Sequence, residues 1–268
     1  MKIKPLSNQH AKYLLGQKRY STAVILSQAG FLVLVLLVWE ALARLELIDA
    51  FITSSPTRIM DTIIQTFATG NLFKHLMVST YETVAGFLLG TLLGTGAAIA
   101  MWWSQFLSDV LEPYVVVLNS LPKIALGPLI IIWVGTGTAS IITMAVLVSV
   151  VVTTITMLNG FNQTNGDKIL LLKTMNASKG QIFLKLVFPA NISTLVAALK
   201  INVGMAWVGT IMGEYLVSKA GLGYLIVYGG QTFKLDLVMS CTIILCALAG
   251  IMYFCVSLLE KAIIRWKD

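Results

Sequence analysis

Charged residues are scarce in this chain. Only 12% of its 268 residues are Asp, Glu, Lys or Arg, whereas 57% are hydrophobic, and the mean hydropathy is +0.85. Soluble domains carry about 25% charged residues, so this deficit excludes a sizeable soluble domain and indicates a protein that crosses a membrane several times. The net charge of +7 is then not a signal for nucleic-acid binding, because Lys and Arg gather at one face of membrane proteins.

Residues that build metal and catalytic sites are equally few. The two histidines, His10 and His75, lie far apart and form no metal-ligand spacing. All three cysteines fall in the last apolar run, and an odd number inside a membrane helix argues against a disulfide framework and a metal site. The phosphate-binding Gly-x-x-x-x-Gly-Lys-Ser/Thr loop is also missing. We therefore predict no enzyme activity, no ATPase site, no metal and no cofactor bound by this chain.

What the chain does contain is a series of long apolar runs. A helix needs about 20 apolar residues to cross the hydrocarbon core. The predicted spans are residues 23–43, 75–101, 111–134, 141–158, 191–212 and 237–259. Residues 1–22 carry Lys and Arg but no acid, so they form a cytoplasmic segment, and residues 23–268 form a single transmembrane domain. The prediction is an all-α polytopic membrane protein with about six transmembrane helices and both termini in the cytoplasm.

Several polar or small residues stand out inside or beside these spans. Gly86, Gly90 and Gly94 recur at four-residue spacing, which favours close helix packing over contact with a solute. Trp207 fits a core position or a gate. We place Glu214 in an outer loop, residues 213–236, where it braces the end of the fifth helix or touches solute.

The third span is expected to be broken by Pro113, Pro122 and Gly127-Pro128. Irregular backbone at membrane depth is tolerated only inside a helix bundle or beside a cavity. The polar residues at the break, and its proline, are Asn119, Ser120, Pro122 and Lys123. They either line a pathway or its gate, or pack within the broken helix. Lys123 could neutralise an anionic solute, pair with Glu82 or bind a lipid headgroup.

The longest polar interruption is residues 159–190, which contain four lysines. We predict two short cytoplasmic helices, 167–175 and 179–187, with the second stopped by Pro189. Between them lies Asn176, a residue type that tolerates the left-handed conformation of a sharp turn. Leu170, Leu171, Leu172 and Met175 would form an exposed apolar row, which favours a docked protein partner. The alternative is a basic loop that lies on anionic headgroups.

Residues 173–178, Lys-Thr-Met-Asn-Ala-Ser, are followed by Leu-Val-Phe-Pro-Ala at 186–190. This stretch resembles the coupling-loop motif of ABC importer permeases, which is Glu-Ala-Ala, three residues, Gly, nine residues and Ile-x-Leu-Pro. Counting back from Pro189 places Leu186 at the Ile position, Asn176 at the Gly position and residues 170–172 at Glu-Ala-Ala. The spacing is kept and the acidic signature is absent.

Further stretches between residues 30 and 267 resemble the nitrate/sulfonate/taurine branch of these permeases. Examples are Ser-Leu-Pro-Lys-Ile-Ala at 120–125, Gly-Met-Ala-Trp at 204–207 and Gly-Leu-Gly-Tyr at 221–224. The resemblance implies the MetI-like fold of a type I importer permease in a bacterial inner membrane. It also implies a second permease copy or paralogue, an external substrate-binding protein, and cytoplasmic ATPase subunits that hold ATP and Mg. The loop residues expected to contact the ATPase are Leu171, Leu172, Lys173, Thr174, Met175, Asn176, Ala177, Ser178, Lys179 and Gly180.

The function implied is ATP-driven import of a small solute, coupled through loop 159–190. The expected solute is a nitrate-, sulfonate- or taurine-like anion, and the alternative is a pyrimidine vitamin precursor or another small aromatic molecule. A different class, an ion-coupled carrier or channel, would need an acidic relay or an inverted repeat, and neither is visible. An intramembrane enzyme would need a catalytic pair, which is also not visible.

Overall fold

The computed structural model describes residues 8–263, apart from the side chains of residues 8–12 and 14, and this part of the chain contains helices and no strand. Part of the predicted cytoplasmic segment 1–22, and the basic residues after Ile263, lie outside the described residues. The chain divides into two units, residues 1–62 and 63–268.

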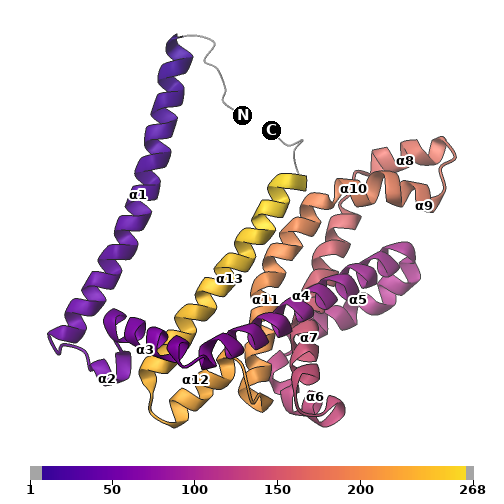
Figure 1. The fold of residues 1–268 in the computed structure, drawn as a ribbon. Coiled ribbons are helices and arrows are strands. Elements are labelled where there is room, and N and C mark those ends of the chain that lie inside the picture. Colours follow the sequence, from indigo (N-terminus) through magenta and orange to yellow (C-terminus); the bar gives the residue numbers. More distant parts are fainter. Residues whose placement is uncertain (1–7, 264–268) are drawn as a thin grey trace. The chain divides into compact units, whose positions relative to one another are not determined.

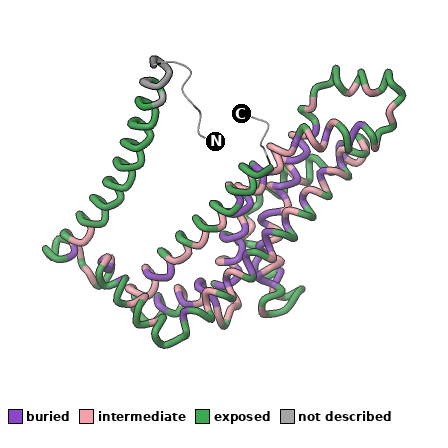
Figure 2. Tube along the Cα trace, turned by 45° about the horizontal axis from the view of Figure 1, so that its top comes forward, coloured by how far each residue is buried: buried purple, intermediate pink, exposed green. Residues whose placement is uncertain are grey.

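The first unit contains α1 (Asn8–Arg44), α2 (Ala50–Thr53) and the first half of α3 (Pro56–Ala68). Glu40 of α1 accepts hydrogen bonds from the amide and the hydroxyl of Thr57, at 3.1 and 2.9 Å, and thereby fixes the start of α3. Ser55 also accepts from the amide of Arg58 at 3.4 Å, which caps the first turn of α3. The most apolar window of α1 has no buried residue, as the exposed colouring in Figure 2 shows. Such a surface is stable only against lipid or another chain.

The second unit is built around three long helices that pack side by side, α4 (Asn71–Trp103), α7 (Thr138–Asn162) and α11 (Ile192–Val217). Figure 2 shows the buried residues gathered on these helices. The long α13 (Leu235–Ile263) packs on α11 and on the short α12 (Leu222–Gln231). Within the described residues, five helices are long and apolar enough to cross a membrane, namely α1, α4, α7, α11 and α13, and a bent pair, α5 and α6, makes six if it counts as one span. The predicted all-α polytopic fold is confirmed.

The glycine stripe of α4 lies directly against α7. A Cβ added at Gly90 would lie 2.6 Å from the Cβ of Ser149, and one at Gly94 would lie 2.6 Å from the Cβ of Thr153. Real side chains do not approach this closely, so the two backbones meet only because the glycines lack a Cβ. The stripe therefore packs helices, as predicted.

The third predicted span consists of α5 (Gln105–Ser120) and a second helical run, a 3₁₀ turn at Lys123–Leu126 followed directly by α6 (Gly127–Val134), with a bend of 95° between the two. The break falls at Pro122, as predicted, whereas Gly127-Pro128 begins α6 without a break. The prediction that Pro113 also breaks the span is wrong, because Pro113 lies inside α5. Its missing amide leaves only the carbonyl of Asp109 without an intrahelical partner, and that carbonyl lies near the polar start of α5, so the helix continues.

At the other polar interruption, α8 (Gly166–Thr174) and α9 (Lys179–Ile182) form the predicted pair of short helices. They project at the opposite end of the second unit from α12 and α6 (Figure 1). The prediction that Pro189 stops the second helix is wrong. After α9 the chain passes through a π-helical turn, Phe183–Val187, and α10 (Phe188–Ala190), and it breaks only at Asn191. Pro189 is tolerated because it occupies a first-turn position of α10, where no amide donor is needed.

Candidate functional site

The turn between α8 and α9 is set by residue types that favour it. Asn176 adopts the left-handed conformation with φ 59°, which Asn tolerates far better than most residues. Ser178 then caps α9 by accepting from the amide of Gln181, and the Gln181 side chain accepts in return from the Ser178 amide at 2.9 Å. This reciprocal cap was not predicted, although Ser followed by Gln three residues later is its usual signature.

An apolar strip on α8 is exposed. The exposed fractions of Leu170, Leu171 and Met175 are 60%, 60% and 70%. Leu172 differs from the prediction, because it is half-buried and packs against the core below the loop. Leu170 and Leu171 of α8, with Met175 at its C-terminal cap, are called the α8 strip.

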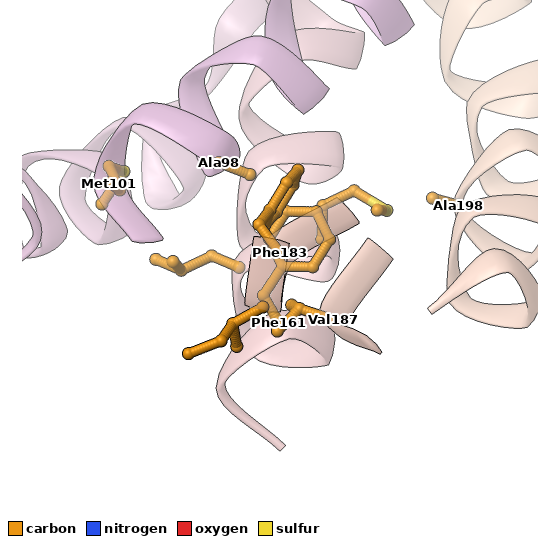
Figure 3. Packing of buried hydrophobic residues seen from close by; sticks show 9 residues of the cluster. Ala98, Met101, Phe161, Phe183, Val187 and Ala198 are labelled. Carbon is orange, nitrogen blue, oxygen red and sulfur yellow. The ribbon is translucent and has the colours of Figure 1, made fainter. Parts of the chain in front are cut away.

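Beneath the strip, the loop is fixed to the membrane helices by a hydrophobic cluster. Phe183 lies at its centre among α4, α7 and the loop, as Figure 3 shows. Its ring centroid lies 5.0 Å from that of Trp102, 5.5 Å from that of Phe161 and 6.0 Å from that of Phe188. Packing of this density transmits displacement rather than absorbing it.

Lys179 was predicted to contact the ATPase, but its side chain makes contacts within this chain. The Nζ atom of Lys179 donates to the carbonyl of Trp103 at 2.6 Å and lies 5.5 Å from the ring centroid of Trp102. Gly180 lies in van der Waals range of Trp103, since a Cβ added there would be 3.6 Å from its ring. Lys179 and Gly180 therefore hold α9 on the end of α4. Lys173, Thr174, Asn176 and Ser178 are exposed, and Ala177 is half-buried.

The break between α5 and α6 presents the predicted polar residues at the surface. Asn119, Ser120 and Pro122 are exposed, and Lys123 is half-buried. The Nζ atom of Lys123 donates to the carbonyl of Asn119 at 3.1 Å, and within the described residues it has no acidic partner. The alternative pairing with Glu82 is therefore wrong.

An apolar cavity of about 550 Å³ adjoins this break. Ile124 of the 3₁₀ turn, Trp207 and Tyr215 of α11, and Cys246 of α13 contribute to its walls. Trp207 is only 7% exposed and also belongs to a core cluster with Phe87, so it acts as a core residue that forms one wall of the cavity. The structure thus brings Trp207 close to the broken helix, which the sequence alone did not show.

Glu214 does not lie in a loop, because α11 continues to Val217. Its side chain is 2% exposed. One carboxylate oxygen accepts from the hydroxyl of Ser79 at 2.5 Å, and the other accepts from the amide of Gly223 at 2.5 Å. The Ser79 hydroxyl also accepts from the amide of Leu222 at 2.7 Å. The first amides of a helix have no partner within the helix, and here a carboxylate and a hydroxyl from two other helices satisfy those of α12.

His75 completes this arrangement. Its Nδ1 atom accepts from the amide of Gly221 at 2.8 Å, and its ring stacks on Tyr224 with centroids 5.8 Å apart. His75 and Ser79 were not predicted as site residues. Their spacing was the available signal, because residues three and four apart share one helical face. His75, Ser79 and Glu82 therefore lie on the same face of α4. Glu214 therefore braces α11 against α4 and α12, which was one of its two predicted roles.

Residues 86–267 match the protein family described as binding-protein-dependent transport system inner membrane component. The chain belongs to this family of transport permeases. Permeases of this kind are membrane-spanning transport subunits, and the long apolar helices of this chain agree with a multi-pass membrane protein.

Individual relatives cover most of this permease. A probable ABC transporter permease of Haemophilus influenzae is 32% identical over 82% of this chain and 89% of its own length. An aliphatic sulfonates transport permease, SsuC, of Bacillus subtilis is 26% identical over 94% and 91%. A formylaminopyrimidine transport permease, ThiX, of Halalkalibacterium halodurans is 28% identical over 72% and 77%.

Solved permeases share the fold. An inward-facing structure of the MetNI methionine ABC transporter superposes with a TM-score of 0.64 at 18% identity, covering 72% of this permease and 95% of that chain. An amino acid ABC transporter with histidines gives a TM-score of 0.59 at 16% identity, covering 76% and 97%. The predicted MetI-like fold is confirmed.

Proposed function

We propose that this permease forms the translocation pathway of an ATP-driven importer and is driven through loop 159–190. ATP and Mg bind to separate cytoplasmic ATPase subunits, a second permease subunit completes the pathway, and an external binding protein delivers the solute. In this arrangement both termini face the cytoplasm. The family description, with its binding-protein dependence, supports this assembly.

The observation that carries the proposal is the contrast between the two faces of the loop. The α8 strip (Leu170, Leu171 and Met175) is exposed by 60–70%, whereas Phe183 on the other face is 6% exposed and packs on α4 and α7. A partner that grips the strip can therefore move the membrane helices. A loop that merely lay on anionic headgroups would present its lysines without an apolar strip, whereas here three large apolar side chains are exposed beside Lys173.

Co-purification tests this docking. The solubilised permease is expected to retain an ATP-hydrolysing subunit, and Met175→Asp is expected to lose that subunit because a carboxylate would be desolvated at the interface. Phe233→Asp is the matched control, since Phe233 is 71% exposed and follows α12 at the opposite end of the unit. Retention of the subunit by Met175→Asp, or solute movement by the purified chain alone, would contradict the proposal and favour an ion-coupled carrier.

For the solute, we propose a small amphipathic molecule with an apolar or aromatic body. Unwound backbone is not stable against lipid, so the cavity beside the α5–α6 break is a candidate for the pathway. Its walls near Ile124 and Trp207 are apolar, and Lys123 lies next to Ile124 in the same 3₁₀ turn. An aliphatic sulfonate or an aminopyrimidine suits these surroundings, as the names of the relatives SsuC and ThiX also suggest. Nitrate, which lacks an apolar body, suits them less.

The native cysteines allow a direct test. Both Cys246 and Cys255 of α13 are exposed, but Cys246 lines the cavity and Cys255 does not. Pentanesulfonate and an aminopyrimidine are expected to slow alkylation of Cys246 by N-ethylmaleimide without affecting Cys255, and taurine is expected to have a weaker effect. Equal protection of both cysteines, or protection by nitrate or taurine alone, would contradict this solute class.

A further inference from the structure

Asn191 lies where loop 159–190 joins the membrane helix α11, between Ala190 and Ile192. The residue is buried, with an exposed fraction of only 7%. Both amide hydrogens are used. The Nδ2 atom donates to the carbonyl of Val187 at 2.9 Å and to the hydroxyl of Thr164 at 2.9 Å.

The first of these bonds repairs the helix break. In a regular α-helix the carbonyl of Val187 would accept from the backbone amide of Asn191. That amide instead bonds to the carbonyl of Phe188 at 3.1 Å. The side chain of Asn191 thus replaces its own backbone amide, so the π-helical end of the loop stays joined to α11.

The second bond crosses the loop. Thr164 follows the end of α7 and precedes α8, so a single amide joins the two ends of a segment 27 residues apart. The helices meet closely at the same point, because a Cβ added at Gly160 of α7 would lie 2.8 Å from the Oδ1 atom of Asn191. That oxygen in turn accepts from the hydroxyl of Thr194 at 3.3 Å.

We propose that Asn191 is a positioning residue that closes loop 159–190 into one rigid body, so that a push on α8 displaces α7 and α11 together. This inference rests on the proposed role of the loop as the contact with the ATPase. Without the bond to Thr164, the two ends of the loop can separate, and the push reaches α11 and its cavity only in part.

A polar cavity of about 280 Å³ beside these residues decides which variants are informative. Gln163, Asn165 and Lys168 line it together with Thr164 and Asn191. A cavity of this size and polarity can hold water, and water can bridge polar groups almost as well as a direct bond. Truncation of Asn191 to Ala would admit such a bridge, so the near-isosteric variants Asn191→Leu and Thr164→Val are the better choices.

The test uses the full transporter and follows two signals in one preparation. One is ATP hydrolysis, and the other is the change in the rate of Cys246 alkylation by N-ethylmaleimide when ATP is added. In the unmodified protein, ATP is expected to change the alkylation rate. Asn191→Leu and Thr164→Val are each expected to keep ATP hydrolysis and to reduce that change about fivefold or more, the range of typical couplings between sites.

Two further comparisons separate this role from a loss of stability. The double variant is expected to be no worse than Asn191→Leu, because Thr164→Val breaks only a link that Asn191→Leu has already lost. Thr156→Val is the control, since the hydroxyl of Thr156 bonds only within α7, to Val152 at 2.8 Å, and Thr164→Ser is expected to behave as the unmodified protein.

An unmodified protein in which ATP leaves Cys246 unchanged would overturn the proposed function, and the inference with it. If ATP changes the alkylation rate of Cys246 in the unmodified protein, either of two results would overturn the role of Asn191 alone. One is an equal change in the single variants, and the other is additive losses in the double variant.

Discussion

Asn176 shows how one residue shapes the proposed coupling loop. Its φ of 59° was expected from the sequence, because Asn stands where a sharp turn between two helical runs needs the left-handed conformation. A β-branched side chain strongly disfavours that conformation, and an L-residue costs about 1–2 kcal/mol there.

Asn176→Val is therefore predicted to distort the α8–α9 turn and to uncouple ATP hydrolysis from the change at Cys246. Asn176→Gly should preserve coupling, because Gly adopts this conformation freely. The measurement is ATP hydrolysis and ATP-dependent alkylation of Cys246 in one preparation. Normal coupling in Asn176→Val would argue against the loop as the moving part.

Gly223 illustrates a residue whose role only the structure explains. A Cβ at this position would lie 2.8 Å from the Cβ of Glu214 and 2.9 Å from its Oε2 atom. The short sequence Gly-Leu-Gly is a turn signal in isolation, and nothing in it indicates that a buried carboxylate from α11 lies against α12.

Gly223→Ala is predicted to lower the free energy of unfolding by about 1–3 kcal/mol through overpacking. Gly230→Ala in the same helix meets no atom within 4 Å, so it should leave stability unchanged or raise it. Thermal unfolding of the detergent-solubilised protein compares them. Equal unfolding temperatures for both variants would contradict the described contact between α12 and Glu214.

At the scale of helices, the contact between α4 and α7 depends on missing side chains. Gly94→Ala would place a Cβ 2.6 Å from that of Thr153 and 2.8 Å from the carbonyl of Val150. Gly96, half a turn away, has nothing within 4 Å. We predict that Gly94→Ala destabilises the helix pair by about 1–3 kcal/mol.

By contrast, Gly96→Ala is expected to be neutral or to stabilise by up to about 1 kcal/mol, because Ala favours helices more than Gly does. Unfolding in detergent, followed by tryptophan fluorescence, provides the measurement. A destabilising Gly96→Ala would show that the glycine-lined face of α4 is not the one described.

The anchoring of the loop gives a second prediction at this scale. Phe183→Ala removes the ring at the centre of the cluster in Figure 3, and loss of a buried Phe costs about 3–5 kcal/mol. Its neighbour Leu184 is 70% exposed, and Leu184→Ala should change stability by no more than about 0.5 kcal/mol. The comparison is made by thermal unfolding, and similar losses in both variants would contradict the anchoring role.

Helices as elements were predictable from the sequence because long apolar runs have few alternatives in a membrane. The glycine stripe and the break at Pro122 followed from local rules in the same way. The predictions for Pro113 and Pro189 were wrong because a proline ends a helix only in some settings. Pro113 leaves one carbonyl without a helical partner, and Pro189 stands in a first turn where no amide donor is needed. The surrounding fold decides which of these settings applies.

At the scale of the whole molecule, the contacts that define the candidate sites are long-range. Ser79 and Glu214 are 135 residues apart, and Thr164 and Asn191 are 27 residues apart. No local pattern pairs them, so the amide partners of α12 and the link across the loop could not be predicted from one sequence. The class of solute could not be predicted either, because Ile124 and Cys246 meet at one cavity only after the broken helix folds against α11 and α13.

The orientation of loop 159–190 and its burial under a separate ATPase subunit are the central claim, and the accessibility of one residue tests both. Met175→Cys, with Cys241, Cys246 and Cys255 replaced by Ala, is treated with a membrane-impermeant maleimide in vesicles of either orientation. We expect labelling only from the cytoplasmic side, and slower labelling when the ATP-hydrolysing subunit is bound. Labelling from the external side, or labelling that the subunit does not slow, would contradict this claim.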